Sequence, residues 1–299
     1  MMTKTGVHGW LLVDKPLGPT SAQVVGRLKW ALREGGYGRV KIGHGGTLDP
    51  LASGLLPIAM GEATKLVQYV LDGRKQYSFR LAFGAETSTD DAEGEIVATS
   101  DIRPSRETLT RALAEFHGPI AQRPPAYSAL KVGGKRAYQR ARAGEQLVLP
   151  ERQVEIFALE LVAMEAGHAD FHVHCSKGTY VRSLARDIAR AVGTVGHVAR
   201  LCRTGAAAFS LRDAVMLDKL VELVQGSQLE QVLLPLTAGL DDIPVLAVDP
   251  GDAVKLKHGQ RLPGSHMTAG RYLATDGPVP VALVDLSEDD IRVVKGFNL

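Results

Sequence analysis

Hydrophobic positions along the chain follow a strand-like pattern in several segments. Residues 10–16 are an apolar run that ends at a proline, and residues 55–60 are a second apolar run, so both are predicted to be buried strands. Residues 76–83 alternate between apolar and polar side chains, which is typical of a half-buried strand. The same reasoning predicts three further strands, over residues 154–164, 171–175 and 197–209.

Amphipathic helices are predicted between these strands. Thr20 and Ser21 can cap a helix whose apolar residues recur at helical spacing until the glycines at 35–38. Residues 181–192 form the clearest helical pattern, with an apolar stripe along one face. Three other helices are predicted, over residues 62–71, 105–117 and 218–234.

The helix predicted at residues 181–192 carries a row of arginines opposite its apolar stripe. Arg182, Arg186 and Arg190 are successive neighbours four residues apart. Like charges at this spacing repel each other by a few tenths of a kcal/mol. We therefore expect an anionic partner beside this face of the helix.

A domain boundary is predicted near residues 241–244, so that residues 1–243 form one domain and residues 244–299 a second. Beyond the boundary, short apolar segments alternate with glycine, proline and histidine, which indicates a small β-rich barrel. The strand candidates there are residues 245–248, 272–274, 279–284 and 291–294. No fixed-period repeat is present, which argues against a solenoid.

Composition narrows the class of protein. The chain has 299 residues, of which 45% are hydrophobic and 23% charged, as in globular proteins. Its two cysteines, Cys175 and Cys202, are far apart and lack metal-ligand spacing, so a disulfide scaffold or a zinc site is not expected. With no secretory-type leader and no apolar run long enough to span a membrane, we expect a cytoplasmic protein.

Charge is distributed unevenly, although the net charge is only +2. Residues 123–144 are rich in proline, glycine and basic side chains, and they are interpreted as a projecting insertion. Residues 86–95 have the opposite, acidic bias and are predicted to be a polar loop. Such asymmetry either marks one face for an anionic partner or is an ordinary solvated surface.

The segment from Gly43 to Pro57 is the strongest candidate for a functional loop. Its glycines at 43, 45 and 46 permit positive φ and a close approach of a ligand to the backbone. Pro50 restricts Asp49 to an extended conformation and so limits the direction of its carboxylate. An Asp-Pro turn without function explains these residues equally well at this point.

Other kinds of site have weaker support. The chain has no Walker loop, and the glycines near residue 43 do not complete a dinucleotide-binding fingerprint. No serine lies in a nucleophile elbow. His168, His172 and His174 are spaced like metal ligands, but their apolar strand context favours a structural role.

Three residues remain as candidates for chemistry: Asp49, Tyr77 and Arg182. A guanidinium beside a carboxylate favours its ionised form and orients it. An ionised, oriented aspartate can serve as a nucleophile or a base. Periodicity and spacing alone do not show whether these distant segments meet.

Residues 43–57, Gly-His-Gly-Gly-Thr-Leu-Asp-Pro-Leu-Ala-Ser-Gly-Leu-Leu-Pro, closely resemble the catalytic motif of the TruB family of tRNA pseudouridine synthases. The resemblance continues, in family order, in residues 14–21, 61–65, 75–77, 124–131, 175–182 and 201–204. Together these blocks cover most of residues 10–210. Residues 244–299 resemble the small RNA-binding PUA domain more loosely.

This resemblance implies specific roles. Asp49 matches the catalytic aspartate, which acts on a flipped-out uridine so that its glycosidic bond breaks and the base rejoins the ribose through C5. Tyr77 matches the tyrosine that stacks on the base, and Arg182 matches the arginine paired with the aspartate. Tyr180 and Leu201 match residues that line the uridine pocket.

The resemblance also implies how RNA is bound. His44 matches a histidine that contacts RNA near the flipped base. Extruding a uridine from a folded loop costs a few kcal/mol, and aromatic stacking returns about 1–3 kcal/mol per base. Attraction to the RNA backbone is expected from four basic residues: Lys15, Lys131, Arg136 and Arg140.

The implied fold is α+β, with a mixed, largely antiparallel sheet, flanking helices and a central cleft, followed by a PUA-like barrel. The implied activity is conversion of the TΨC-loop uridine at position 55 of tRNA, without metal or organic cofactor. A monomer is the default expectation for the oligomeric state. The insertion at 123–144 would clamp the stem-loop, and Tyr127 to Lys131 within it favours the stand-alone form. Two alternatives stay open: a guide-RNA-dependent relative and a protein that chiefly helps RNA to fold.

Overall fold

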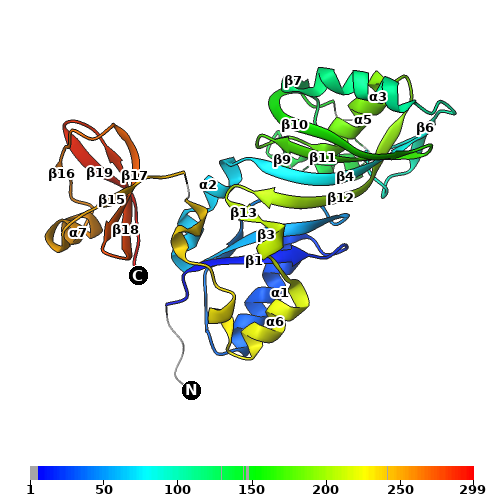
Figure 1. The fold of residues 1–299 in the computed structure, drawn as a ribbon. Helices are drawn as coiled ribbons and strands as arrows, with labels where there is room; N and C mark the ends of the chain where they lie inside the picture. Colours follow the sequence, from blue (N-terminus) through cyan, green and yellow to red (C-terminus); the bar gives the residue numbers. More distant parts are fainter. Residues whose placement is uncertain (1–5, 129, 144, 146–147, 241) are drawn as a thin grey trace.

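The computed structural model describes residues 6–128, 130–143, 145, 148–240 and 242–299. One large sheet with helices on its flanks forms the first part of the chain, and a small β-rich unit forms the second (Figure 1). The α+β class predicted from the sequence is confirmed.

The large sheet is mixed and mostly antiparallel, also as predicted. Among the described strands of this sheet, β1–β14 and β3–β12 are the parallel pairs. In spatial order, the strands are β14 (Val215–Met216), β1 (Gly9–Lys15), β3 (Ala52–Met60), β12 (Gly196–Ala206), β4 (Lys75–Phe83), β11 (His168–Cys175), β10 (Arg152–Glu165) and β7 (Gly118–Gln122). Two short strands join this path: β2 (Ile42–His44) pairs with β3, and β13 (Phe209–Ser210) pairs with β12.

Helix α1 (Ser21–Glu34) begins where the sequence predicts. Thr20 is its N-cap: its hydroxyl accepts the Gln23 N–H at 3.1 Å, and the Gln23 side chain accepts the Thr20 N–H at 2.7 Å. These reciprocal bonds are a capping box, which satisfies two otherwise unpaired backbone donors. The apolar face of α1 packs with α6 (Leu217–Gln225) against β1 and β3.

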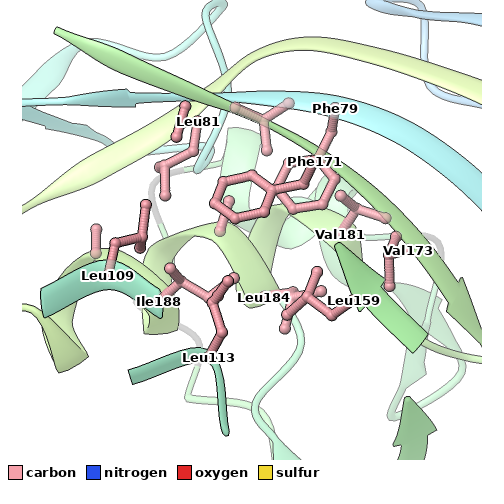
Figure 2. Packing of buried hydrophobic residues seen from close by; sticks show 14 of the residues in the cluster. Phe79, Leu81, Leu109, Leu113, Leu159, Phe171, Val173, Val181, Leu184 and Ile188 are labelled. Carbon is pink, nitrogen blue, oxygen red and sulfur yellow. The ribbon is translucent and has the colours of Figure 1, made fainter. Parts of the chain in front are cut away.

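A second core lies under the other half of the sheet. Helices α3 (Arg106–Leu113) and α5 (Val181–Ala191) bury Leu109, Leu184 and Ile188 against β4, β10 and β11 (Figure 2). Phe79 and Phe171 stack there, with ring centroids 5.0 Å apart. Full burial of each such side chain contributes about 1.5–3 kcal/mol.

Three predicted helices are shorter than the sequence pattern suggests. Residues 62–71 divide into a 3₁₀ turn, Gly61–Lys65, and helix α2 (Val67–Asp72). Helix α3 changes to a 3₁₀ turn at Ala114–Phe116, and α6 ends at Gln225, with Gly226 as its C-cap, far before residue 234. Glycine at a helix end favours termination, so the later apolar residues form a separate 3₁₀ turn, Leu229–Gln231.

The two segments of biased charge contain more structure than predicted. The acidic segment begins within β5 (Ala85–Thr87) and leads directly into β6 (Ile96–Thr99), and these two strands form a hairpin. The basic segment contains β8 (Lys131–Val132), β9 (Lys135–Arg136) and α4 (Ala137–Arg142). Its beginning does not project: Pro124 and Pro125 are buried, and the Arg123 carbonyl accepts the Ser183 hydroxyl at 2.8 Å.

The C-terminal unit has a five-stranded sheet that buries its own apolar core. Its strands, in spatial order, are β15 (Val245–Ala247), β17 (Gly270–Asp276), β18 (Val279–Leu286), β19 (Asp290–Gly296) and β16 (Leu262–Pro263). Helix α7 (Pro250–Lys257) was not predicted, although Asp249 caps it and proline opens it, which is a recognised helix-start signal.

The C-terminal unit packs on the segment that contains α2. Leu273, Leu283 and Phe297 share one buried cluster with Leu66 and Val70. The Lys65 ammonium donates to the Gly296 carbonyl at 2.7 Å, and the Asn298 N–H donates to Glu62 at 2.9 Å. In the described part of the chain, no helix is both long and apolar enough to cross a membrane.

Candidate active site

Residues 45–51 join β2 to β3 and contain Gly45, Gly46 and Asp49, and we call them the glycine loop. Ser21 holds it from the first turn of α1: its hydroxyl accepts the Leu48 N–H at 2.8 Å and donates to the Leu48 carbonyl at 3.1 Å. Both bonds are buried, and Leu48 immediately precedes Asp49. Ser21 therefore fixes the backbone that carries the carboxylate, a role that the sequence did not reveal.

The glycines act differently from the prediction. Of those at 43, 45 and 46, only Gly46 has a positive φ, of +126°. A Cβ on Gly46 would lie 3.2 Å from the Arg203 guanidinium, and one on Gly45 would lie 3.0 Å from the Val70 side chain. These two glycines thus make room for the protein's own side chains.

Asp49 and Arg182 meet, as the family resemblance implies. Arg182 Nη2 lies 2.8 Å from Asp49 Oδ2, and Arg182 is almost fully buried while the Asp49 side chain is 44% exposed. The same guanidinium contacts Asp91 at 3.3 Å and donates to the carbonyls of Thr89 and Tyr127, both at 3.0 Å. Four acceptors fix its plane, so it presents a rigid donor to an accessible carboxylate.

The other two arginines of the row on α5 also have carboxylate partners within the chain. Arg186 contacts Asp90 at 2.8 Å, and Arg190 contacts Glu86 at 2.7 Å. The anionic partner that the spacing predicts is therefore the chain's own acidic segment. These pairs hold the β5–β6 hairpin against α5.

A cavity of about 290 Å³ opens beside Asp49. Its walls come from the glycine loop, β4, the turn before α5 and β12, and they include Tyr77, Tyr180, Arg182 and Leu201. This volume is close to that of small-ligand sites. Five residues proposed from the sequence thus surround one space.

His44 does not line that cavity. It lies on β2 opposite Ile58 of β3, and its Nδ1 is buried with no hydrogen-bond partner among the described residues. Burial and the nearby positive charge of Arg203 lower the pKa of His44, so its ring is neutral at pH 7.

Arg203 is the most important site residue without an assigned role from sequence. It is 1% exposed, donates to the carbonyls of Leu55 at 2.8 Å and Gly46 at 3.1 Å, and lies opposite Tyr77 in the β12–β4 pair. Burial raises the pKa of Tyr77, although the Arg203 charge opposes this, so the hydroxyl stays protonated at neutral pH. A buried guanidinium thus links the glycine loop to the wall of the cavity.

Lys15 is not available to RNA, contrary to the prediction. Its side chain is 0% exposed, and its ammonium donates to the carbonyls of Pro16 at 2.9 Å, Pro19 at 2.8 Å and Pro50 at 3.5 Å. A lysine at the end of a strand usually extends into solvent, but here three carbonyls replace its water. Lys15 ties the end of β1 to the residue after Asp49.

Lys15→Met is expected to lower the free energy of unfolding by about 2–4 kcal/mol, because buried carbonyls lose their donor. Burial lowers the pKa of Lys15 to about 8, from 10.5. Between these values the unfolded chain binds more protons than the folded one, so the lysine's contribution to stability rises with pH there.

Urea unfolding of wild type and Lys15→Met at pH 7 and pH 9.5 tests this prediction. The difference between the two proteins should be larger at pH 9.5. The matched control is the exposed Lys219→Met, whose effect should be small at both pH values. A difference that shrinks with pH would contradict the assigned role of Lys15.

The remaining basic residues are less informative. Lys131 and Arg136 lie in the β8–β9 hairpin, and their side chains are outside the described part of the structure. Arg140 contacts Glu145 at 2.6 Å. Lys75, a cavity residue, donates to the carbonyls of Val70 and Gly73 at 2.8 and 2.6 Å, and burial lowers its pKa to about 8.

Two family models and several curated proteins match this chain. The TruB family pseudouridylate synthase N-terminal domain matches residues 34–181, and the tRNA pseudouridylate synthase B C-terminal domain matches residues 182–241. The tRNA pseudouridine synthase B of Novosphingobium aromaticivorans is 54% identical over 298 residues, which are 98% of each chain. That of Zymomonas mobilis is 50% identical over 292 residues, which are 98% of this chain and 96% of the relative.

Solved structures agree on the fold. A protein of an H/ACA RNP bound to a substrate RNA containing 2′-deoxyuridine superposes with a TM-score of 0.74 at 23% identity, over 97% of this chain and 85% of that one. One from a Cbf5-Nop10-Gar1 complex gives the same TM-score at 24% identity and the same coverage. The chain belongs to the TruB family of tRNA pseudouridine synthases.

Proposed function

We propose that this enzyme converts the uridine at position 55 in the TΨC loop of tRNA to pseudouridine, and that Asp49 acts directly on the flipped-out nucleotide. As a member of its family, the chain is an isomerase. The observation that carries the proposal is the ion pair between Asp49 and the buried Arg182, at the wall of a cavity that also contains Tyr77. It supplies an accessible carboxylate that a rigid guanidinium orients.

The reaction moves the base from one ribose bond to another. The N1–C1′ bond breaks, the base turns within the cavity, and a C5–C1′ bond forms while the C5 proton is transferred to a base or to water. Nothing is oxidised or reduced, and the leaving base is retained. The isomerisation thus needs an oriented carboxylate and room for the base to turn, and Asp49 with the cavity beside it supports this assignment.

The cavity residues have separate roles in this proposal. Tyr77 stacks on the extruded base, while its protonated hydroxyl interacts with the buried Arg203 guanidinium. Tyr180 and Leu201 form the walls that position the base. His44, whose ring is neutral and only partly buried, contacts RNA at the approach to the cavity.

RNA attraction comes from outside the cavity. The segment 123–144 clamps the stem-loop, and Lys131, Arg136 and Arg140 lie near the RNA phosphates. The start of this segment is bonded to α5 beside Arg182, which keeps the segment next to the cavity. The C-terminal unit acts as a PUA-like RNA-binding domain. We expect the enzyme to work as a monomer in the cytoplasm, without a guide RNA.

The test is incubation of the purified protein with an unmodified tRNA transcript, followed by mapping of any pseudouridine. Pseudouridine at position 55 of the transcript, formed without a guide RNA, supports the proposal. Product at other positions, or only after a guide RNA is added, would contradict it. A transcript with cytidine at position 55 is the matched control.

A further inference from the structure

A second cavity, also of about 290 Å³, lies at the end of α1, away from Asp49. Four of its lining residues are cations, and none is acidic: Lys29, Arg33, Arg39 and Lys41 share it with Leu32, Gly38 and Val40. We name these four residues the α1 basic cluster. All four are exposed.

The α1 basic cluster differs from the other cations near the site. Within the described residues, none of its members has a carboxylate partner, whereas Arg27 on the same helix contacts Asp218 at 2.7 Å. The arginines of α5 are likewise paired with acids. Four like charges around one hollow repel each other and are stabilised when an anion enters.

The α1 basic cluster lies next to the start of β2, the strand that leads to the active site. The Lys41 carbonyl accepts the Gly61 N–H at 2.7 Å, which fixes the chain where β2 begins. From Lys41, β2 runs about 10 Å to His44, at the usual rise per strand residue, and the glycine loop with Asp49 follows. Gly45 is then bonded to Pro57 of β3 at 2.7 Å, so this path is rigid.

An aromatic side chain accompanies the cluster. Trp30 is 50% exposed and lies three residues before Arg33, on adjacent positions of the α1 surface. Exposed aromatic rings beside cations are typical of surfaces that bind single-stranded nucleic acid, since bases stack on the ring while phosphates meet the cations.

From these observations we infer that the α1 basic cluster binds backbone phosphates of the RNA strand adjacent to the target nucleotide. The inference rests on the proposed function, because it takes RNA in the Asp49 cavity as its starting point. The cluster guides the strand along β2 toward the glycine loop. Inorganic phosphates offer the same chemistry, so the experiment must separate the two sources.

The test compares wild type with the triple variant Lys29→Ala/Arg33→Ala/Arg39→Ala, using a short RNA stem-loop that carries the target uridine. We expect the dissociation constant to rise about tenfold or more, and the slope of log affinity against log salt to fall in magnitude by about 2, since each phosphate contact contributes about 0.7–0.9. KM for pseudouridine formation should rise similarly, with turnover at saturating RNA nearly unchanged.

The matched control removes three exposed cations elsewhere: Arg106→Ala/Arg111→Ala/Lys219→Ala. It has the same net charge as the triple variant but should bind nearly as wild type does. Thermal unfolding of all three proteins checks that the fold is retained.

Several outcomes would overturn the inference. The first is an equal loss of stem-loop affinity in the triple variant and the control. The second is a loss of affinity seen only with full-length tRNA. The third comes from a separate titration of wild type and triple variant with inorganic pyrophosphate: the variant loses pyrophosphate binding while its RNA affinity is unchanged. Absence of conversion by the wild type would instead contradict the proposed function. The two failures are therefore distinguishable.

Discussion

Asp49→Asn is expected to abolish pseudouridine formation while leaving RNA binding close to normal. Asparagine has nearly the same shape, and its side-chain oxygen can still accept from Arg182 Nη2, which lies 2.8 Å from the carboxylate in the wild type. The amide cannot act as a nucleophile or a base, so we expect turnover to fall by about 10³-fold or more, or about 4 kcal/mol in barrier height.

Single-turnover conversion and filter binding with the same tRNA transcript measure the two effects. Because the Asp49 side chain is half exposed and Arg182 retains Asp91, the fold should be unaffected. Asp218→Asn, which changes an exposed carboxylate paired with Arg27, is the matched control and should turn over normally. Substantial turnover by Asp49→Asn would exclude the proposed mechanism.

Short-range features of the site could be predicted from sequence because their causes are local. The Thr20 cap and the buried strand before Met60 depend on residues only a few positions apart. The helix at Val181 is equally local, since its apolar stripe sets its face. Each of these elements positions part of the cavity.

Long-range partners could not be predicted in the same way. Spacing showed that the arginines on α5 needed anions, but Asp91 lies 91 residues before Arg182 and only the folded sheet brings them together. Lys15 was misjudged because lysine is almost never fully buried. Its carbonyl partners come from two loops that no pattern connects.

Glycines illustrate the same limit. Gly46 has a positive φ, which glycine adopts readily and which its residue type makes predictable. The side chain for which it leaves room is that of Arg203, on a strand far along the chain, and this could not be predicted. Arg203 lies in a block that matches the family, residues 201–204, but the resemblance assigned no role to it. Its two carbonyl bonds show that it connects the loop to β3, so the cavity wall depends on a contact that sequence alone does not show.

Arg182→Ala is expected to lower turnover by about 10²-fold or more while changing RNA affinity far less. Arg182 is almost fully buried, so it is poorly placed to meet a phosphate, and its contact with Asp49 orients the carboxylate. A misplacement of about 1 Å in an active site can cost about 10²-fold. Turnover and the dissociation constant are measured separately on the same transcript.

Loss of stability is the main competing explanation for that result. Removing the guanidinium leaves the Asp91 carboxylate, whose side chain is 9% exposed, without its cation, although Thr89 and Glu93 still donate hydrogen bonds to it. Breaking a buried ion pair in this way costs up to about 3–5 kcal/mol. The double variant Arg182→Ala/Asp91→Asn removes the unpaired charge and should regain most of this stability. Its turnover should nevertheless remain low, because Asp49 still lacks its guanidinium.

Arg182→Lys separates charge from geometry. A lysine keeps the positive charge but cannot reproduce the planar fork that contacts Asp49, Asp91 and two carbonyls. We expect its turnover to lie between wild type and Arg182→Ala, with RNA affinity unchanged. Equal losses of affinity and turnover across the series would instead mark Arg182 as a phosphate contact, and recovery of turnover in the double variant would show that stability alone was at fault.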